Sequence, residues 1–348
     1  MLKNDTQIYD AIMIPQHDED EKEQNIQKPK SRSILQHMIK LFLYTIILIF
    51  ISMDKKTLED IKTRILSLIP EHEYKYFSCF CGMGRYENLY ARELIQHYIS
   101  LGVEKFYLGD NNYKNTEKLS DVLQDYINNG TVEITNLIGT KNYKKLQSDT
   151  YQFFYSNHKK ECKWMMYFDF DEFLYFTDKN ITTMKDYLSH PRFDKCDVVK
   201  VNWVIYDDND LVLYDNRPVK ERFTRPDFSN SQNKYIKSIV RGNIFEPIWS
   251  INGSPHTPNR YKSICNSVGI RHRSHSFTEK PDFSLCYLAH YRTKTIEEFA
   301  YKTKRGWPDG SLDYQERLNF FFENNKYTDE KLEVYKRALN VTNVTYHI

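Results

Sequence analysis

The chain has 348 residues, of which 40% are hydrophobic, and its 49 basic and 47 acidic side chains give a formal net charge of +2. This length and composition suit a folded domain with appendages and exclude a disordered chain. The near balance of charge provides no strong field for nucleic acid, which we therefore exclude as a partner.

The cysteines give little guidance on metal binding or compartment. They include no C-x-x-C pair, so a zinc site is not indicated. In an oxidising compartment Cys265 and Cys286 would be a candidate disulfide pair, and buried free thiols are the alternative. The six stand at positions 79, 81, 162, 196, 265 and 286.

The amino-terminal segment divides into three parts. Residues 1–33 are polar and read as a solvated tail. Residues 34–53 are almost wholly apolar after Lys40, which predicts a transmembrane anchor, with a buried helix as the alternative. We expect residues 54–73 to be a stem, residues 74–310 to be a catalytic domain and residues 311–348 to be a helical extension.

Localisation depends on this anchor. Basic residues flank it on both sides, so charge alone does not orient it. N-glycosylation sequons favour a single-pass, type II protein with a luminal catalytic domain in a Golgi-like or ER-like compartment. If residues 34–53 do not span a membrane, we expect a cytoplasmic protein. The sequons begin at Asn129, Asn180, Asn252, Asn340 and Asn343.

From residue 74 the pattern alternates between strand and helix. Apolar runs bounded by turn residues predict strands, and apolar positions at helical spacing predict helices. Such alternation indicates an α/β fold with a mostly parallel, Rossmann-like sheet flanked by helices, followed by C-terminal helices. The predicted strands are 74–82, 104–112, 131–137 and the run from 163, and the predicted helices are 85–103, 117–130, 146–159 and two after 310.

The run WMMYFDFDEFLYF, residues 164–176, places three carboxylates in an apolar strand. Ligands of open α/β sheets bind beyond the carboxyl ends of the strands, where Asp110 and Asn111 also lie. On an extended strand Asp169 and Asp171 would point the same way. Adjacent carboxylates repel one another unless a cation lies between them, so the pair predicts a site for Mn²⁺ or Mg²⁺.

Other interpretations of the acid pair are weaker. It could cap a turn or meet a lysine, since Asp-x-Asp occurs often by chance. A calcium loop of the EF-hand type needs Gly where Leu174 stands. A phosphatase of the haloacid dehalogenase type would have Thr or Val where Phe173 stands.

Several segments in order resemble glycosyltransferase family 92 and related GT-A enzymes. These are ENLYARELIQHYISLGVEKFYLGDNN (87–112), Gln147 and Tyr151 ahead of Trp164 and DFDEF, then ERF (221–223), KSIVRG (237–242), PHTP around His256, and LAHYRTKTIEEFAYKTKRG (288–306). The resemblance covers about residues 75–308. It implies a GT-A fold and transfer of a sugar from a nucleotide-diphosphate sugar, such as UDP-galactose, to a glycan acceptor with inversion.

The resemblance also implies roles for individual residues. Asp169 and Asp171 would hold Mn²⁺ or Mg²⁺, with His290 as a third ligand. The donor nucleotide sugar would contact Asp169 again, together with Asp110, Asn111, Lys237, Lys294 and Lys302, because a diphosphate needs cations around it.

An inverting transfer needs a base for the acceptor hydroxyl. Glu221 is the first candidate, followed by Glu172 and His256, and each could instead be structural. The segment WVIYD (203–207) lacks a Gly of the family pattern and motivates a second hypothesis, an inactive glycan-binding or scaffolding relative. A third is a phosphotransfer enzyme that uses the same acids.

Overall fold

The computed structural model describes residues 72–137, 143–243, 263–271, 276–306 and 313–346, with isolated positions between 38 and 57 and at 256 and 258. The chain divides into two units, Met1–Glu73 and Tyr74–Ile348. The predicted tail, anchor and stem lie outside the described residues except for those isolated positions and the first residues before Tyr74. Within the described part of the chain no helix has the length and apolar character needed to cross a membrane.

The first half of the second unit follows the predicted alternation of strand and helix. The elements, in order, are β1 (Tyr76–Gly84), α4 (Asn88–Ser100), β2 (Lys105–Asp110), α5 (Leu119–Asn128), β3 (Val132–Asn136), α6 (Tyr143–His158) and β4 (Cys162–Tyr167). Turn residues end the helices as expected: Gly102 and Gly130 both have a φ of +80°, in the region that favours glycine.

The second half mixes short strands with helices. Its elements are β5 (Glu172–Phe176), α7 (Met184–Leu188), β6 (Val198–Tyr206), α8 (Val219–Arg222), β7 (Pro226–Asp227), β8 (Ile236–Arg241), β9 (Ile264–Cys265), β10 (Cys286–His290), α9 (Ile296–Lys304), α10 (Tyr314–Asn324) and α11 (Asp329–Leu339). Two 3₁₀ turns, Pro191–Phe193 and Ser231–Lys234, complete the described elements.

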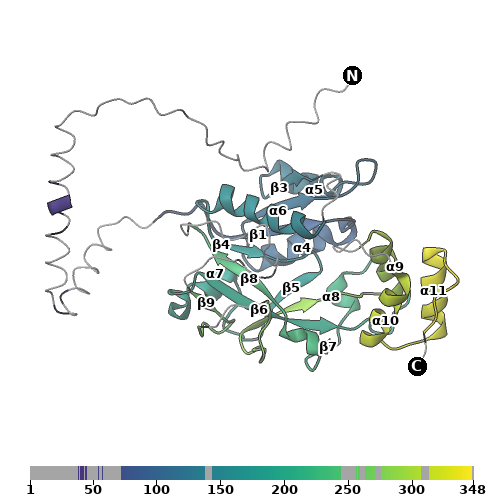
Figure 1. Ribbon diagram of the computed structural model, residues 1–348. Coiled ribbons are helices and arrows are strands. Elements are labelled where there is room, and N and C mark those ends of the chain that lie inside the picture. Colours follow the sequence, from purple (N-terminus) through teal and green to yellow (C-terminus); the bar gives the residue numbers. More distant parts are fainter. Residues whose placement is uncertain are drawn as a thin grey trace, which may run out of the picture. The chain divides into compact units, whose positions relative to one another are not determined.

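One mixed sheet runs through this unit in the order β3-β2-β1-β4-β8-β6-β10-β5 (Figure 1). Strands β3, β2, β1 and β4 pair in parallel, and β6 pairs in parallel with β10. Only β8 and β5 on this path run in the opposite direction. The prediction of a mostly parallel α/β sheet flanked by helices is therefore confirmed.

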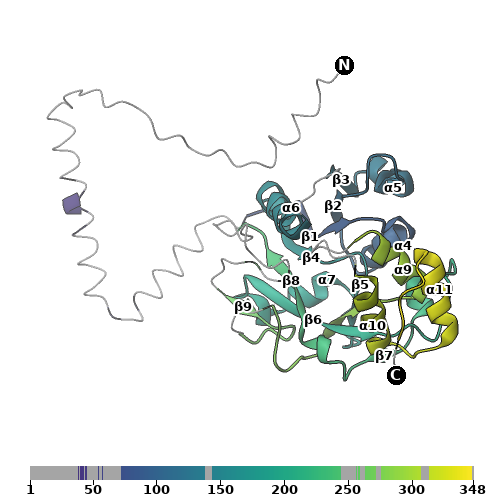
Figure 2. The ribbon, with the colours of Figure 1, turned by 45° about the vertical axis from the view of Figure 1, so that its right-hand side comes forward.

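Helices cover both faces of the first four strands (Figure 2). Successive side chains of β1 point to opposite faces. Phe80 packs with residues of α4 and α5, whereas Cys79 and Cys81 pack with Tyr151 and Tyr155 of α6. This two-sided burial explains why the strands are apolar throughout rather than alternating.

The C-terminal helices form a smaller cluster of their own. Phe299 of α9, Phe321 of α10 and Tyr335 of α11 are fully buried in it. Figures 1 and 2 both place α9, α10 and α11 side by side. The predicted pair of helices after residue 310 is confirmed.

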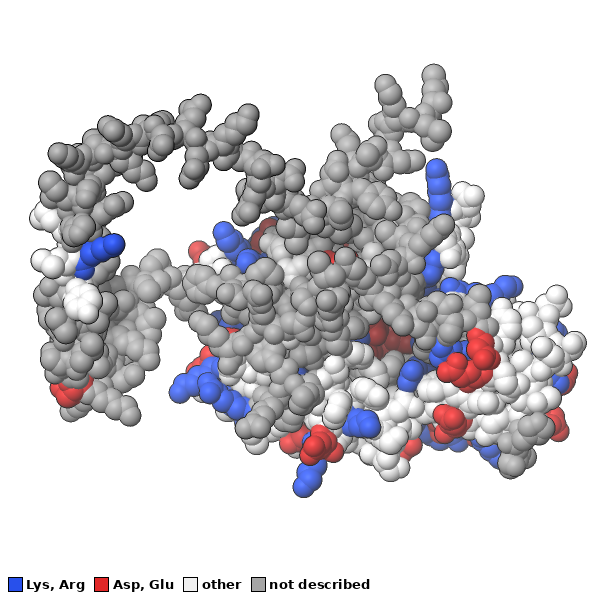
Figure 3. All heavy atoms as spheres, in the orientation of Figure 1, with Lys and Arg blue, Asp and Glu red and all other residues white. Residues whose placement is uncertain are grey.

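The described surface carries no patch of a single sign on the face shown in Figure 3, where basic and acidic side chains are interspersed. Four of the five sequons lie on described, exposed asparagines, namely Asn129, Asn180, Asn340 and Asn343.

One expectation from the sequence is wrong. The carboxylates do not lie on one continuous strand, because β4 ends at Tyr167 and β5 begins at Glu172. Three other strands separate β4 from β5 in the sheet. The chain must therefore leave β4 at its carboxyl end and cross that edge of the sheet before β5 begins. The crossing is a turn in which the Glu172 N–H donates to the Asp169 carbonyl at 3.2 Å.

The candidate pair of Cys265 and Cys286 does not form, and Cys286 is a buried free thiol, the alternative given above. Cys265 bonds to Cys196, and a second disulfide joins Cys79 to Cys162. Cys265 lies on β9, which pairs with the start of β6, whereas the buried thiol of Cys286 lies on β10 opposite Phe176. The two cysteines thus lie beside different ends of β6, since β9 pairs with Val198 and Val199 and β10 pairs with Trp203 to Ile205.

Candidate active site

The turn of residues 168–171 carries the acid pair across the carboxyl edge of the parallel strands. Its central residue, Phe170, is 2% exposed and anchors the turn in the core. Gly84 at the end of β1 leaves room for this ring, since a Cβ there would lie 3.2 Å from Phe170 Cζ. The turn is therefore fixed by packing, and the two carboxylates on either side of Phe170 are held at the edge of the sheet.

Asp169 is bound by side chains from two other elements. Its Oδ2 accepts a hydrogen bond from Lys237 Nζ of β8 at 2.7 Å, and its Oδ1 accepts one from Gln147 Nε2 of α6 at 2.8 Å. Burial opposes its ionisation, but the charge of Lys237 outweighs this effect and lowers the pKa of Asp169. With a third of its side chain exposed, this carboxylate is open to a ligand.

Asp171 is more deeply buried and meets two groups of the C-terminal region. Lys302 Nζ of α9 lies 2.5 Å from its Oδ2, and His290 Nε2 at the end of β10 lies 3.5 Å from its Oδ1. Burial opposes ionisation here as well, but Lys302 and His290 together hold the pKa of Asp171 well below its ordinary value. Burial lowers the pKa of His290, which favours the neutral imidazole.

Glu172 lies beneath the acid pair and is fully buried. Its Oε2 accepts the N–H of Asp169 at 2.9 Å, and Lys237 Nζ lies 3.8 Å from its Oε1. Burial raises the pKa of Glu172 well above its ordinary value, against the opposing charge of Lys237. This side chain supports the turn from inside the protein.

The carboxyl end of β2 lies next to that of β1. Both oxygens of Asp110 accept backbone hydrogen bonds, from Asn112 N at 2.9 Å and from Leu119 N at the start of α5 at 2.8 Å. Asn111 is 1% exposed, and neither atom of its side-chain amide has a hydrogen-bond partner among the described residues. Buried polar groups are nearly always paired, so an unpaired amide at this edge indicates a place for a ligand.

The structure does not bring the candidate bases together in one place. Glu221 is exposed on α8, whose next residue, Arg222, forms a buried ion pair with Glu298. His256 lies against Trp203, with ring centroids 5.4 Å apart, and its Nδ1 is 3.0 Å from the Ile236 carbonyl. Burial, assisted by Lys237, lowers the pKa of His256 to about 4, so its ring is neutral at pH 7.

Helix α9 positions the basic side chains of the site. It begins with a capping box in which Thr295 and Glu298 exchange hydrogen bonds, as Thr-x-x-Glu predicts. Lys302 and Arg305 then follow on one face, and Arg305 pairs with Glu87 at 2.6 Å. Lys294, just before the cap, has a φ of 54°, an uncommon conformation for a residue with a side chain.

Two contributors to the site, Gln147 and Glu87, were given no role there from the sequence, and the pairing of Glu87 with Arg305 was not predicted. Gln147 lies four residues before Tyr151 on α6. This spacing places both side chains on one face of the helix, and it was the only sign in the sequence that Gln147 faces the site. Arg305 and Glu87 are 218 residues apart, and no local pattern connects them.

The donor atoms suit a hard cation, but the side chains as they stand do not enclose one. Among the described residues no three His, Cys, Asp or Glu side chains converge as a metal site. Each aspartate is instead neutralised by a lysine, Asp169 by Lys237 and Asp171 by Lys302. The oxygens of this pair and the neutral imidazole of His290 are nevertheless ligand types that Mn²⁺ accepts.

Carboxylates, buried lysines and an unpaired amide thus meet at the carboxyl edge of a mostly parallel sheet, which is where α/β enzymes bind phosphorylated ligands. The profile described as Glycosyltransferase family 92 matches residues 74–319. The protein belongs to that family and is a glycosyltransferase.

The comparison with solved structures gives a distant likeness. The crystal structure of S. aureus TarS 1-349 is 13% identical, with 75% of this chain and 72% of that chain covered and a TM-score of 0.33. At that TM-score the likeness assigns neither fold nor function. Curated proteins give no match.

Proposed function

We propose that this enzyme transfers a hexose from a UDP-sugar, with UDP-galactose the first to test, to a glycan acceptor with inversion at the anomeric carbon. The observation that carries the proposal is the pairing of Asp169 and Asp171 with Lys237 and Lys302 at the carboxyl edge of the sheet. A leaving diphosphate needs cations around it, and two lysines already lie at this point.

Charge balance supports binding of the donor together with a metal ion. The two aspartates and two lysines cancel, so a divalent cation alone would leave the cluster with excess positive charge. The diphosphate of a UDP-sugar carries two negative charges. If it binds together with Mn²⁺, the net charge of the cluster therefore stays unchanged. The lysines would then turn from the carboxylates to the phosphates.

The residues that would hold Mn²⁺, or Mg²⁺, are Asp169, Asp171 and His290. When bound, the ion acts as a Lewis acid that stabilises the charge developing on the diphosphate. Lys237 and Lys302 would contribute to the same stabilisation through hydrogen bonds to phosphate oxygens. Phe170 holds the turn in the core, so these groups need little rearrangement of backbone.

The nucleoside would lie at the end of β2. Asn111 offers one amide donor group and one acceptor there, which match the N–H and carbonyl of a uracil edge. Asp110 would act mainly by fixing this segment, because its oxygens already bind two backbone N–H groups. Lys294 is a further candidate for the donor, and its surroundings are described below.

The base and the membrane anchor stay predictions. Glu221, Glu172 and His256 remain candidates for the base, with Glu221 the most accessible of the three. The span of residues 34–53 lies outside the described structure, and a luminal, type II arrangement is proposed on the sequence alone.

A panel of UDP-sugars, GDP-sugars and UDP, each with and without Mn²⁺, tests the proposal by thermal shift. A ligand at a hundred times its Kd stabilises a folded protein by about 2.7 kcal/mol. We expect stabilisation by UDP and at least one UDP-sugar, and none in Asp169→Asn. No shift with any nucleotide would favour an inactive glycan-binding relative. In a separate assay, release of phosphate from phosphate monoesters would favour a phosphotransfer enzyme.

A further inference from the structure

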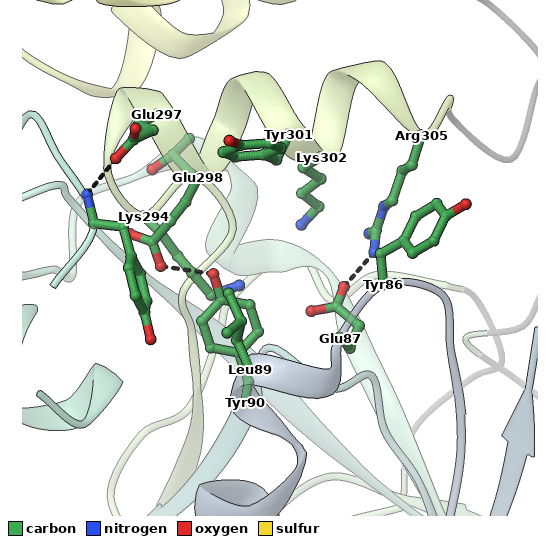
Figure 4. Close-up of a pocket in the computed structure, with 12 residues that line it drawn as sticks. Tyr86, Glu87, Leu89, Tyr90, Lys294, Glu297, Glu298, Tyr301, Lys302 and Arg305 are labelled. Atoms are coloured by element: carbon green, nitrogen blue, oxygen red, sulfur yellow. Dashed lines mark hydrogen bonds and ion pairs between the residues drawn. The ribbon is translucent and has the colours of Figure 1, made fainter. Parts of the chain in front are cut away.

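A pocket of about 340 Å³ lies between the start of α4 and helix α9 (Figure 4). Its volume falls in the range of about 300–1,000 Å³ usual for small-molecule sites. Lys302 lines this pocket and also contacts Asp171, so the pocket adjoins the acid pair. Of the residues proposed above for the donor, Lys294 and Lys302 line this pocket, whereas Asn111, Asp169 and Lys237 do not.

The charges that line the pocket cancel. Three are positive and three negative: Lys294, Lys302, Arg305, Glu87, Glu297 and Glu298. Most are already paired, Arg305 with Glu87 at 2.6 Å and Glu298 with Arg222 at 2.7 Å. A dianionic diphosphate would gain little from such a balanced set, so the pocket favours a neutral, hydroxyl-bearing ligand.

Two adjacent residues in the pocket have polar groups left to bind such a ligand. Thr293 is 2% exposed, and its Oγ1 has no hydrogen-bond partner among the described residues. The Lys294 ammonium lies 4.0 Å from the centre of the Tyr90 ring and forms no ion pair with a described residue. The left-handed backbone of Lys294 is the kind of strain that clusters at ligand-binding sites.

Aromatic rings complete the pocket. Tyr301 is 63% exposed, and Tyr86 and Tyr214 are more than a third exposed, although all three line the cavity. Exposed rings beside a pocket give flat apolar faces on which the C–H groups of a sugar ring can stack. Figure 4 shows Tyr301 on α9 across the cavity from Tyr90 of α4.

We infer that this pocket binds the acceptor saccharide, with Thr293 and Lys294 bound to its hydroxyls and Tyr301 stacked on its ring. The inference rests on the proposed function and specifies where the second substrate binds. Lys302 connects the two substrates, because it lines the acceptor pocket and contacts the acid that would hold the donor. A hydroxyl placed here would face the site of transfer.

The test uses the full chain saturated with UDP and Mn²⁺, with methyl glycosides of galactose, glucose, N-acetylglucosamine, mannose and fucose as probes. Their dissociation constants are measured by saturation-transfer NMR for wild type, Thr293→Val, Tyr301→Ala and the control Phe228→Ala, an exposed aromatic outside the pocket. Thr293→Val keeps the shape and removes only the hydroxyl. We expect at least one glycoside to bind and both pocket variants to weaken it about fivefold or more.

The affinity for UDP separates this inference from the proposed function. We expect UDP to bind wild type, both pocket variants and the control within twofold. Absence of UDP binding to wild type would overturn both proposals. Three results would overturn the acceptor assignment alone. In the first, UDP binds but no glycoside does. In the others, both pocket variants bind the glycoside as wild type does, or both pocket variants lose UDP binding instead.

Discussion

Lys302 Nζ lies 2.5 Å from Asp171 Oδ2, although 131 residues separate them in sequence. The pair connects helix α9 to the turn that carries the acids, and Lys302 lies where the proposed donor site and the proposed acceptor pocket meet. Asp171 is buried and Lys302 is largely buried, with 7% and 15% of their side chains exposed, so neither charge is well solvated once the other is removed.

Removal of Lys302 should therefore destabilise the fold. We expect Lys302→Met to lower the free energy of unfolding by about 3–5 kcal/mol, because it removes the nearest cation from the buried Asp171 carboxylate. The double variant Lys302→Met, Asp171→Asn should recover part of this loss in urea titrations. Equal stability of wild type and Lys302→Met would mean that the pair is not formed in solution.

Metal and nucleotide should bind cooperatively. Because the aspartates are already matched by lysines, we expect Mn²⁺ alone to bind weakly and saturating UDP to tighten it at least about tenfold. Titration calorimetry of Mn²⁺ with and without UDP measures this, and linkage requires the same factor for UDP with and without Mn²⁺. Identical Mn²⁺ affinities in the two titrations would argue against the charge-balance account.

Much of this arrangement could be predicted from residue patterns close together in the chain. The alternation of apolar strands with helices up to β4 defined the sheet, and DFDEF indicated the acid pair. The turn between β4 and β5 was missed because an uninterrupted apolar run looks the same whether it forms one strand or two. Nothing within the run indicates that β5 pairs with β10.

Contacts between distant segments could not be predicted. Lys302 was recognised as a cation in the right block, but its pairing with Asp171 depends on how α9 packs. Thr293 carried no sequence signal at all, because its significance lies in an unpaired hydroxyl that only the surrounding packing produces.

The disulfide pattern is a direct check on the second half of the sheet. Peptide mapping without reduction should link Cys79 to Cys162 and Cys196 to Cys265. Cys81 and Cys286 should react with an alkylating reagent only after denaturation, because both thiols are buried. A Cys265–Cys286 peptide would contradict the position of β9.

Glu221 can be tested as the base by one substitution. A general base contributes about 10²–10⁴-fold, so Glu221→Gln should lower kcat by that factor if this first candidate is the base. Retention of transfer within about twofold would contradict this role for the exposed side chain on α8. The neighbouring exposed Lys220→Gln serves as the matched control.

His97 should make stability fall at acidic pH. Burial lowers its pKa from about 6.5 to about 4, although its Nε2 binds the Leu174 carbonyl at 2.9 Å. The unfolded chain therefore takes up this proton first, and stability present above pH 6.5 is lost as pH falls towards 4, by about 3 kcal/mol.

Urea titrations at pH 7, 5.5 and 4.5 measure the contribution of His97. His97→Gln should show a shallower decline of stability than wild type, whereas substitution of the exposed His190 should not change the slope. Parallel declines in His97→Gln and wild type would exclude this buried imidazole as a source of acid sensitivity.

The central claim is that Asp171, held between Lys302 and His290, belongs to the site of sugar transfer. Radiolabelled transfer from UDP-galactose and other UDP-sugars to a glycan panel, with Mn²⁺, tests it most directly. Asp171→Asn is compared with Asp194→Asn, an exposed aspartate, after both are shown to be folded. The account predicts that Asp171→Asn loses at least about a hundredfold in kcat while Asp194→Asn matches wild type. Full transfer by folded Asp171→Asn would contradict it.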